Sequence, residues 1–176
     1  MKFDKLIRAR YSVRKFSTRP VEEKKILAIM EAARVAPSAK NNQSWRVLVI
    51  SQGNALEKLK QCTPCHYNAP LAFVFCYDKS QCYVQEASGR ISGEVDATIA
   101  GTHMMLEACD LGIGSTWVMN FEPEKIKDFF HIPEDYEVVS LLVCGYPSGD
   151  SRISKRHTEY KPMETLFTYN DYALNP

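Results

Sequence analysis

The sequence lacks several features that mark common classes of protein. Its 22 Lys and Arg residues are nearly balanced by 21 Asp and Glu residues, which leaves a formal charge of +1. Proteins that bind nucleic acid or an anionic membrane need a clear basic excess. No run of about 18 apolar residues occurs, and the segment after Met1 contains no apolar signal-peptide core. We therefore expect a cytoplasmic protein that binds neither nucleic acid nor a membrane.

Glycine-rich nucleotide motifs and the usual hydrolase motifs are also missing. Gly112 and Gly114 begin like a dinucleotide fingerprint, but Trp117 stands where the third glycine belongs and a predicted strand follows. The sequence contains no Gly-Lys-Ser/Thr of a P-loop. Ser148 lies one position late for a nucleophile elbow. Nothing in these patterns supports hydrolase chemistry.

The six cysteines predict no disulfide framework, because disulfides are rare in a reducing compartment. Cys76 and Cys144 lie in apolar runs and are expected to be buried. Cys62, Cys65 and His66 match the C-x-x-C-H pattern of haem attachment, although no export signal accompanies it. No second C-x-x-C completes a zinc site. A haem site, a zinc site and a coincidental loop are the three interpretations of this segment.

Hydrophobic periodicity predicts an alternation of helices and strands. Within 95–111, small and flexible residues from Ala97 to Ala108 line one face, as in a helix packed closely in a core. The composition, 45% hydrophobic and 24% charged, is that of an ordinary globular chain, and the length predicts a single domain over residues 1–176. We expect an α+β fold with a central mixed β-sheet flanked by helices. Helices are expected at 22–34, 54–61, 95–111 and 123–130, buried strands at 45–50 and 71–77, further strands at 115–118 and 136–146, and an amphipathic segment at 163–169.

Two polar segments are not explained by core packing or helix capping. In the first, Arg10, Ser12 and Arg14 alternate with Tyr11 and Val13, so an extended backbone points the first three to one face. Guanidiniums bind phosphate bidentately and stabilise negative charge on a ring carbonyl. The alternative is a solvated basic strand edge.

The second polar segment, residues 36–45, joins the end of a predicted helix to a predicted strand. Ser38, Asn41 and Gln43 supply neutral hydrogen-bond donors and acceptors. Such groups suit a sugar alcohol or the edge of a heterocycle. The alternative is a polar turn without a ligand.

Together these segments resemble the nitroreductase family of FMN-dependent oxidoreductases. Residues 10–16 are similar to the family's R-x-S-x-R-x-F, and residues 36–45 to its A-P-S-x-x-N-x-Q-P-W, with Ser44 in place of the second proline. Asp96 opens the helix that leads into residues 111–117, similar to L-G-L-G-S-C-W. Residues 145–147 and the tail around Pro162 are similar to the closing G-Y-P and P-L-E-E. The four pieces occur in the family's order and cover nearly the whole chain.

The resemblance implies an intertwined homodimer with FMN at the subunit interface. Arg10, Ser12 and Arg14 would hold the phosphate and the pyrimidine side of the flavin, and residues 37–41 of the partner subunit would contact the ribityl chain and ring. Residues 117–120 would run beside the ring, and Arg156 or Lys161 would complete phosphate binding. The full set of expected cofactor-binding residues is Arg10, Tyr11, Ser12, Arg14, Pro37, Ser38, Ala39, Asn41, Gln43, Trp117, Val118, Met119, Asn120, Arg156 and Lys161.

The resemblance also implies the chemistry. Hydride would pass from NAD(P)H via flavin N5 to a nitro compound, a quinone or a similar acceptor by a ping-pong mechanism, with no catalytic side chain and with Arg14 tuning the flavin. The alternatives are a specialised relative, such as a dehalogenase or dehydrogenase, and a non-catalytic flavin-binding or redox-sensing protein that uses Cys62 and Cys65. Residues 78–94, long for a plain connection, are expected to contact the acceptor through Tyr83 and Arg90.

The sequence departs from the family pattern in its tail and in one loop. Tyr160 stands where an arginine often precedes Lys161, and residues 62–68 lack a basic residue where larger members place a flavin-contacting lysine. A chain of 176 residues is also short for a domain plus a large cofactor. We therefore expect each chain to carry part of two flavin sites.

Overall fold

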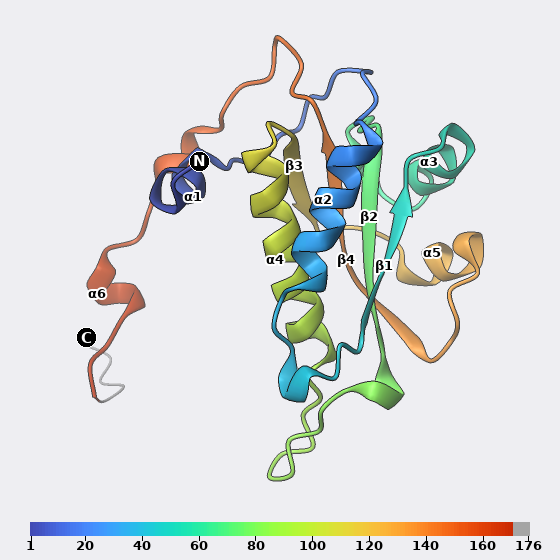
Figure 1. The fold of residues 1–176 in the computed structure, drawn as a ribbon, viewed down its shortest axis with the longest axis vertical. Helices are drawn as coiled ribbons and strands as arrows, with labels where there is room; N and C mark the ends of the chain where they lie inside the picture. Colours follow the sequence, from blue (N-terminus) through green and yellow to red (C-terminus); the bar gives the residue numbers. More distant parts are fainter. Residues whose placement is uncertain (171–176) are drawn as a thin grey trace.

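A computed structural model describes residues 1–170, and its four strands form one sheet of order β1-β2-β4-β3 (Figure 1). All three neighbouring pairs are antiparallel, so the four strands do not form the mixed sheet expected from the sequence. Helix α4 (Gly93–Asp110) connects β2 to β3, and β4 lies between these two strands and runs in the opposite direction. A parallel contact is made by the isolated bridge between Ser12 and Ser115. The strands are β1 (Trp45–Ile50), β2 (Leu71–Asp78), β3 (Gly114–Val118) and β4 (Tyr136–Gly145).

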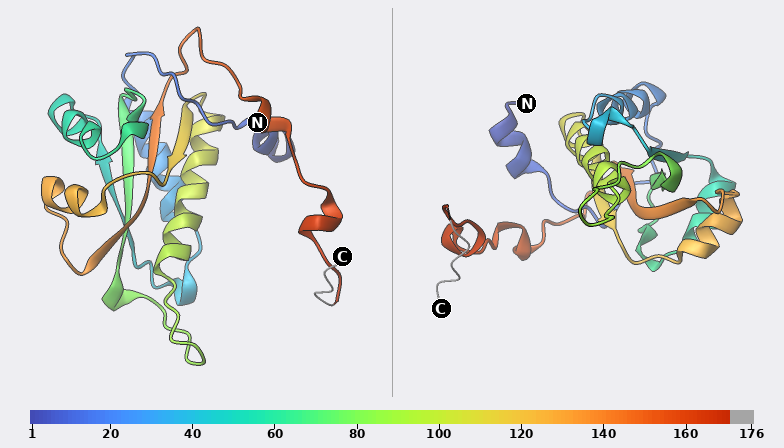
Figure 2. Two further views of the ribbon diagram at one scale, coloured as in Figure 1. Left: turned by 180° about the vertical axis from the view of Figure 1, so that it is seen from behind. Right: turned by 90° about the horizontal axis from the view of Figure 1, so that it is seen from below.

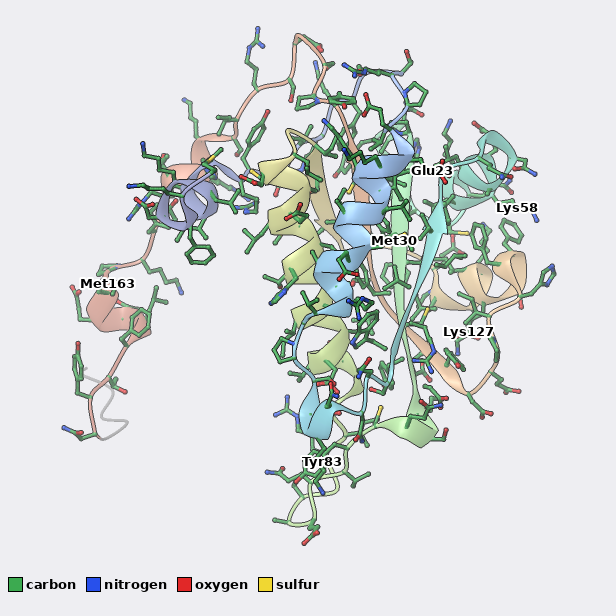
Figure 3. All side chains as sticks on the ribbon, in the orientation of Figure 1. Glu23, Met30, Lys58, Tyr83, Lys127 and Met163 are labelled. Carbon is green, nitrogen blue, oxygen red and sulfur yellow. The ribbon has the colours of Figure 1, made fainter. Side chains whose placement is uncertain are left out.

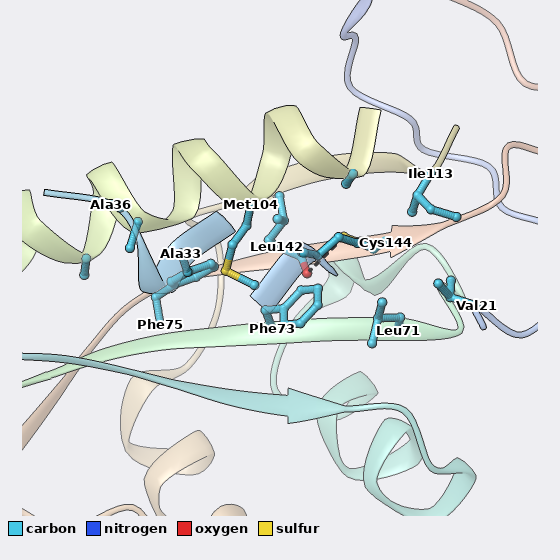
Figure 4. Packing of buried hydrophobic residues seen from close by; sticks show 14 of the residues in the cluster. Val21, Ala33, Ala36, Leu71, Phe73, Phe75, Met104, Ile113, Leu142 and Cys144 are labelled. Carbon is cyan, nitrogen blue, oxygen red and sulfur yellow. Dashed lines mark hydrogen bonds between the residues drawn. The ribbon is translucent and has the colours of Figure 1, made fainter. Parts of the chain in front are cut away.

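Helices cover both faces of the sheet (Figure 2). Side chains of β2 alternate between the two faces: Phe73 and Phe75 join the core under α2 (Glu23–Arg34) and α4, drawn in Figure 4. Val74 and Cys76 join the core under α3 (Gly53–Lys60) and α5 (Pro123–Phe130). The expectation of a buried strand is confirmed for β2, whereas β1 lies at the sheet edge and is mostly half-buried.

Helix α4 packs closely on the sheet through its small residues. The predicted face is confirmed, because Ala97, Ala100 and Ala108 are fully buried. A Cβ atom on Gly101 would lie 2.4 Å from the indole ring of Trp117, so only glycine permits this approach. The Trp117 ring in turn packs on Phe75, with ring centroids 5.2 Å apart.

Both ends of the described chain lie away from the sheet (Figures 1 and 2). Helix α1 (Phe3–Ala9) was not expected from the sequence, and none of its residues is buried. The C-terminal arm, residues 151–170, carries a short 3-10 helix, η4 (Lys155–Thr158), and α6 (Met163–Leu166). The amphipathic segment expected at 163–169 is helical only over Met163–Leu166, and Leu166 and Phe167 are more than half exposed. Figure 3 places Met163 far from the sheet, and among the described residues Leu166 and Phe167 join neither hydrophobic core.

The segment between β2 and α4 is more ordered than expected. After the short 3-10 helix η3 (Lys79–Gln81), Val84 and Ile91 form an antiparallel bridge. Residues 83–92, called the hairpin below, project beyond the sheet (Figure 1). Most residues between Val84 and Ile91 are polar, so no periodicity signalled the pairing. No helix among residues 1–170 is long and apolar enough to cross a membrane.

Candidate functional site

Arg10, Ser12 and Arg14 line one pocket together with Arg156 from the C-terminal arm. This pocket, called the cationic pocket below, has a volume of about 340 Å³. Three guanidiniums and a hydroxyl therefore surround one space, and guanidiniums bind phosphate with two parallel hydrogen bonds. The remaining lining residues are Ile7, Tyr11, Ser154, His157 and Tyr160.

The first wall of the cationic pocket is an extended segment anchored to β3. Helix α1 ends at Arg10, whose backbone is already extended. Val13 is 1% exposed, and its N–H donates to the Ser115 carbonyl at 3.0 Å. The Thr116 hydroxyl donates to the Val13 carbonyl. Because Val13 points into the core, the residues directly before and after it, Ser12 and Arg14, point the other way and line the pocket.

The second wall comes from the C-terminal arm. His157 Nε2 lies 3.0 Å from the Arg8 carbonyl, and its ring meets that of Tyr11 edge-on at 6.3 Å. These contacts hold η4, and with it Arg156, beside the N-terminal segment. His157 was not identified as a site residue from the sequence. Its position next to Arg156 was the signal that could have identified it. Lys161, the other expected phosphate ligand, is exposed and does not line the cationic pocket.

Arg14 also lies next to Tyr67, in the loop that follows the C-x-x-C-H segment. Burial, and then a hydrogen bond with Cys65, raises the pKa of Tyr67, and Arg14 opposes this rise through its own hydrogen bond and charge. The loop thus places a phenol beside Arg14.

The loop 37–43, which contains Pro37, is held in an unusual backbone conformation. Lys40, Asn41 and Gln43 all have positive φ, of 51°, 56° and 50°. Such values are uncommon for residues other than glycine and persist where surrounding contacts enforce them. The Ser38 hydroxyl accepts a hydrogen bond from the Gln43 N–H at 3.0 Å, and Asp96 Oδ1 accepts one from the Ala39 N–H at 2.9 Å. The loop therefore presents exposed amides on a fixed backbone.

The two polar segments lie at opposite ends of α4. Arg10 lines a small pocket with Cys109 in the last turn of the helix, whereas Ala39 binds Asp96 in the first turn. The helical stretch between Asp96 and Cys109 is about 20 Å long. Arg10 and the loop 37–43 are therefore separated by most of the length of α4.

The third expected strip, residues 117–120, offers mainly backbone. The side chains of Trp117 and Val118 lie in the cores on opposite faces of the sheet. Met119 is 61% exposed and is available to a ligand. The Asn120 carbonyl accepts a hydrogen bond from the Thr63 hydroxyl at 2.6 Å, which ties the strip to the C-x-x-C-H segment.

The side chains of the C-x-x-C-H segment have separate structural partners. Cys62 is 1% exposed, and its thiol donates to the Lys58 carbonyl at 3.4 Å. Burial raises the pKa of Cys62, which disfavours the thiolate that metal binding and redox exchange require. His66 Nδ1 accepts from the Asn68 N–H at 3.0 Å. Over residues 1–170, no group of three or more His, Cys, Asp or Glu side chains is placed to hold a metal ion.

The fold and the two polar segments define an α+β protein with a cationic pocket near one end of α4 and a polar loop at the other. A family model described as "Nitroreductase family" matches residues 7–66 and 64–146. The chain belongs to the nitroreductase family.

Individual relatives agree in sequence and in fold. A protein of Methanothermobacter thermautotrophicus with the provisional name NADH dehydrogenase/NAD(P)H nitroreductase is 32% identical over 149 residues, which are 81% of this chain and 75% of the relative. The crystal structure of a nitroreductase family protein from Clostridium difficile superposes with a TM-score of 0.92 at 33% identity and covers 97% of this chain and 99% of that one. An FMN-dependent nitroreductase from Clostridium difficile has a TM-score of 0.72 at 27% identity, with 97% and 98% covered.

Proposed function

We propose that this chain is an FMN-dependent oxidoreductase that uses NAD(P)H as its electron donor. The observation that carries the proposal is the cationic pocket, in which Arg10, Ser12 and Arg14 meet Arg156. A phosphate monoester needs several charged and hydroxyl donors around one volume, and this pocket supplies them. The names of the relatives, which include an FMN-dependent nitroreductase and NADPH-dependent oxidoreductases, agree with this assignment.

The residues present fit FMN. Arg10, Arg14 and Arg156 would hold the phosphate and the polar edge of the ring system, and Ser38 and Asn41 would offer neutral groups to the ribityl hydroxyls. Met119, exposed at the end of β3, would contact the ring. When bound, FMN supplies two-electron transfer between the nicotinamide and an acceptor, so the protein needs no nucleophilic side chain.

We further propose a homodimer in which each FMN is shared by two chains. The placement of Arg10 and the loop 37–43 at opposite ends of α4 supports it, because a flavin held by Arg10 would then meet the loop of a partner chain. The exposed arm with Leu166 and Phe167 supports it as well, because large apolar side chains without a packing surface mark interaction sites. Residues 1–176 would form one FMN-binding domain, and a cytoplasmic location stays a prediction from the sequence.

Nitro compounds, quinones or similar molecules are the proposed acceptors. Donor and acceptor would use the site in turn, which predicts parallel lines in double-reciprocal plots. Tyr83 and Arg90, on the hairpin, are the proposed acceptor contacts. A relative specialised for dehalogenation or dehydrogenation would fail to turn over a nitroaromatic with NADPH, so that assay separates the two functions.

The visible spectrum of the purified protein tests the assignment. We expect a yellow protein that NADPH bleaches under anaerobic conditions, and size-exclusion chromatography with light scattering should show a dimer. A colourless protein that takes up no added FMN would refute the proposal. Bound FMN that nicotinamide does not reduce would instead identify a non-catalytic flavin protein.

Arg14→Ala tests the electrostatic role of the cationic pocket. Loss of a charged hydrogen bond should weaken FMN binding by about tenfold or more, or slow flavin reduction by NADPH to a similar extent. The matched control is Arg152→Ala, because Arg152 is an exposed arginine in the C-terminal arm and bonds only carbonyls of its own turn among the described residues. Unchanged affinity and reduction rate in Arg14→Ala would remove this residue from the site.

A further inference from the structure

Asp96 is a buried carboxylate that bonds both the loop 37–43 and Ser92, the N-cap residue of α4 at the base of the hairpin. It lies in the first turn of α4 and is only 2% exposed. Its Oδ1 accepts from the Ala39 N–H at 2.9 Å, and its Oδ2 accepts from the Ser92 hydroxyl at 2.7 Å. A buried carboxylate is costly unless charge-assisted hydrogen bonds satisfy it, and here both oxygens are used.

Through Oδ1, Asp96 fixes the loop 37–43. The Ala39 N–H is the first backbone donor of a turn in which Lys40 and Asn41 then take left-handed conformations. Positive φ at two successive residues other than glycine is unfavourable for a free loop. The hydrogen bond between Ala39 and Asp96 holds the start of this turn against the N-terminal end of α4.

Through Oδ2, Asp96 fixes the base of the hairpin. The Ser92 hydroxyl that donates to Asp96 also accepts from the Tyr83 N–H at 3.2 Å. The Ser92 N–H donates to the Tyr83 carbonyl at 3.0 Å, which closes the hairpin. Figure 3 shows Tyr83 at this end of the molecule, below the sheet.

The loop also contacts Tyr83 of the hairpin and Gln81 of η3, which precedes the hairpin. The Lys40 ammonium lies 4.9 Å from the centroid of the Tyr83 ring, and the Asn42 side-chain amide donates to the Gln81 carbonyl at 3.1 Å. The two segments therefore form one surface, and Asp96 is the buried group bonded to both.

We propose that Asp96 is a positioning residue that holds the loop 37–43 and the hairpin in one arrangement, so that the flavin contacts and the acceptor contacts are set together. The inference rests on the proposed function for its ligands. Asp96 itself would contact neither the flavin nor the acceptor. It acts through Ala39 on one side and through Ser92 and Tyr83 on the other.

A general role in helix stability does not account for this geometry. An acidic residue in the first turn favours a helix through its dipole, but Glu94 supplies that charge from an exposed position in the same turn. Glu94→Gln is therefore the matched control, since it removes one negative charge from the turn without touching the loop or the hairpin base.

Amide hydrogen exchange of the protein without flavin is the first readout. We expect Asp96→Ala to speed exchange by about tenfold or more in both the loop 37–43 and the hairpin. Ser92→Ala should speed it in the hairpin alone, because the Asp96–Ala39 bond remains. Asp96→Asn keeps an acceptor for the Ala39 N–H and should restore protection of the loop.

FMN affinity and acceptor KM are the second readout. Asp96→Ala should raise the Kd for FMN by about tenfold, whereas Ser92→Ala should raise the KM for a nitroaromatic acceptor and leave the Kd for FMN unchanged. If Asp96→Ala does not fold, Ser92→Ala tests the hairpin arm, with Asp96→Asn as the variant whose loop should stay protected; unchanged hairpin exchange in Ser92→Ala would then contradict the inference.

Two results would overturn the inference. One is an amide exchange rate in Asp96→Ala that equals that of Glu94→Gln in both the loop and the hairpin. The other is a uniform rise in the exchange rate of Asp96→Ala over the whole chain, which would indicate global destabilisation. If the wild-type protein binds no FMN, the proposed function fails, and the exchange pattern still decides whether Asp96 positions the two segments.

Discussion

Gly101→Ala tests the close packing of α4 on the sheet. The added Cβ would lie 2.4 Å and 2.5 Å from two ring carbons of Trp117 and 3.2 Å from a ring carbon of Phe75. Carbon atoms in ordinary contact are about 3.5–4.0 Å apart, so the indole must retreat by roughly 1 Å. The Phe75 ring, 5.2 Å behind it, leaves little room for that movement.

The expected magnitude follows from two opposing effects. Overpacking a filled core costs about 1–3 kcal/mol, and the two short contacts in a confined position argue for the upper end. Alanine gains about 1 kcal/mol over glycine within a helix. The net loss is about 2 kcal/mol, which for a chain of this length lowers Tm by roughly 4–8 °C.

Thermal unfolding of the flavin-free protein, followed by circular dichroism at fixed protein concentration, measures this loss. Gly53→Ala is the control, because Gly53 also lies in a helix and a Cβ there meets no atom within 4 Å. We expect Gly53→Ala to keep or slightly raise the Tm. A Tm for Gly101→Ala at or above that of the control would refute the packing argument.

Two further predictions concern stability. Ser44 is fully buried, and its hydroxyl has no hydrogen-bond partner within the described part of the chain. Ser44→Ala should therefore raise the free energy of unfolding in urea by about 1 kcal/mol. A lower free energy of unfolding would show that the hydroxyl is hydrogen-bonded. A hydrogen bond from Lys15, and then one from Ser148, lowers the pKa of Asp150 to about 2. The ionised Asp150 should therefore contribute to the stability of the folded protein at pH values above the ordinary carboxyl pKa. This contribution should be lost as the pH falls toward 2. Lys15→Ala should raise the pKa of Asp150 in an NMR titration, and an unchanged value would contradict the pairing.

Local pattern predicted the elements well. The helix expected at 95–111 is Gly93–Asp110, and the strand expected at 45–50 is Trp45–Ile50. Periods of 3.6 and 2 residues report which side chains face a core, and this information is contained within each segment. The hairpin was missed because its sequence carries no apolar period. Helix α1 was missed although Phe3, Leu6 and Ile7 are spaced at i, i+3 and i+4, because seven residues are too few for a clear pattern.

The direction of the strands could not be predicted in the same way. Alternating helices and strands favour a parallel arrangement, but β4, the last strand in the chain, inserts between β2 and β3. That insertion depends on packing between distant segments. Similarly, residues 163–169 carry an amphipathic pattern, and within residues 1–170 they join neither hydrophobic core.

For the candidate site, the sequence by itself determined which residue types are present and in what order: two arginines around Ser12, an amide-rich loop after Pro37, and a basic tail. The tertiary structure decided which of them meet. It brings Arg156 rather than Lys161 to the cationic pocket and recruits His157. It also sets the loop 37–43 at the far end of α4, bonded to Asp96. The physical reason is that side-chain chemistry is local, whereas proximity depends on the anchoring of Val13 to β3, on the close packing that Gly101 permits, and on the length of the helix between the two segments.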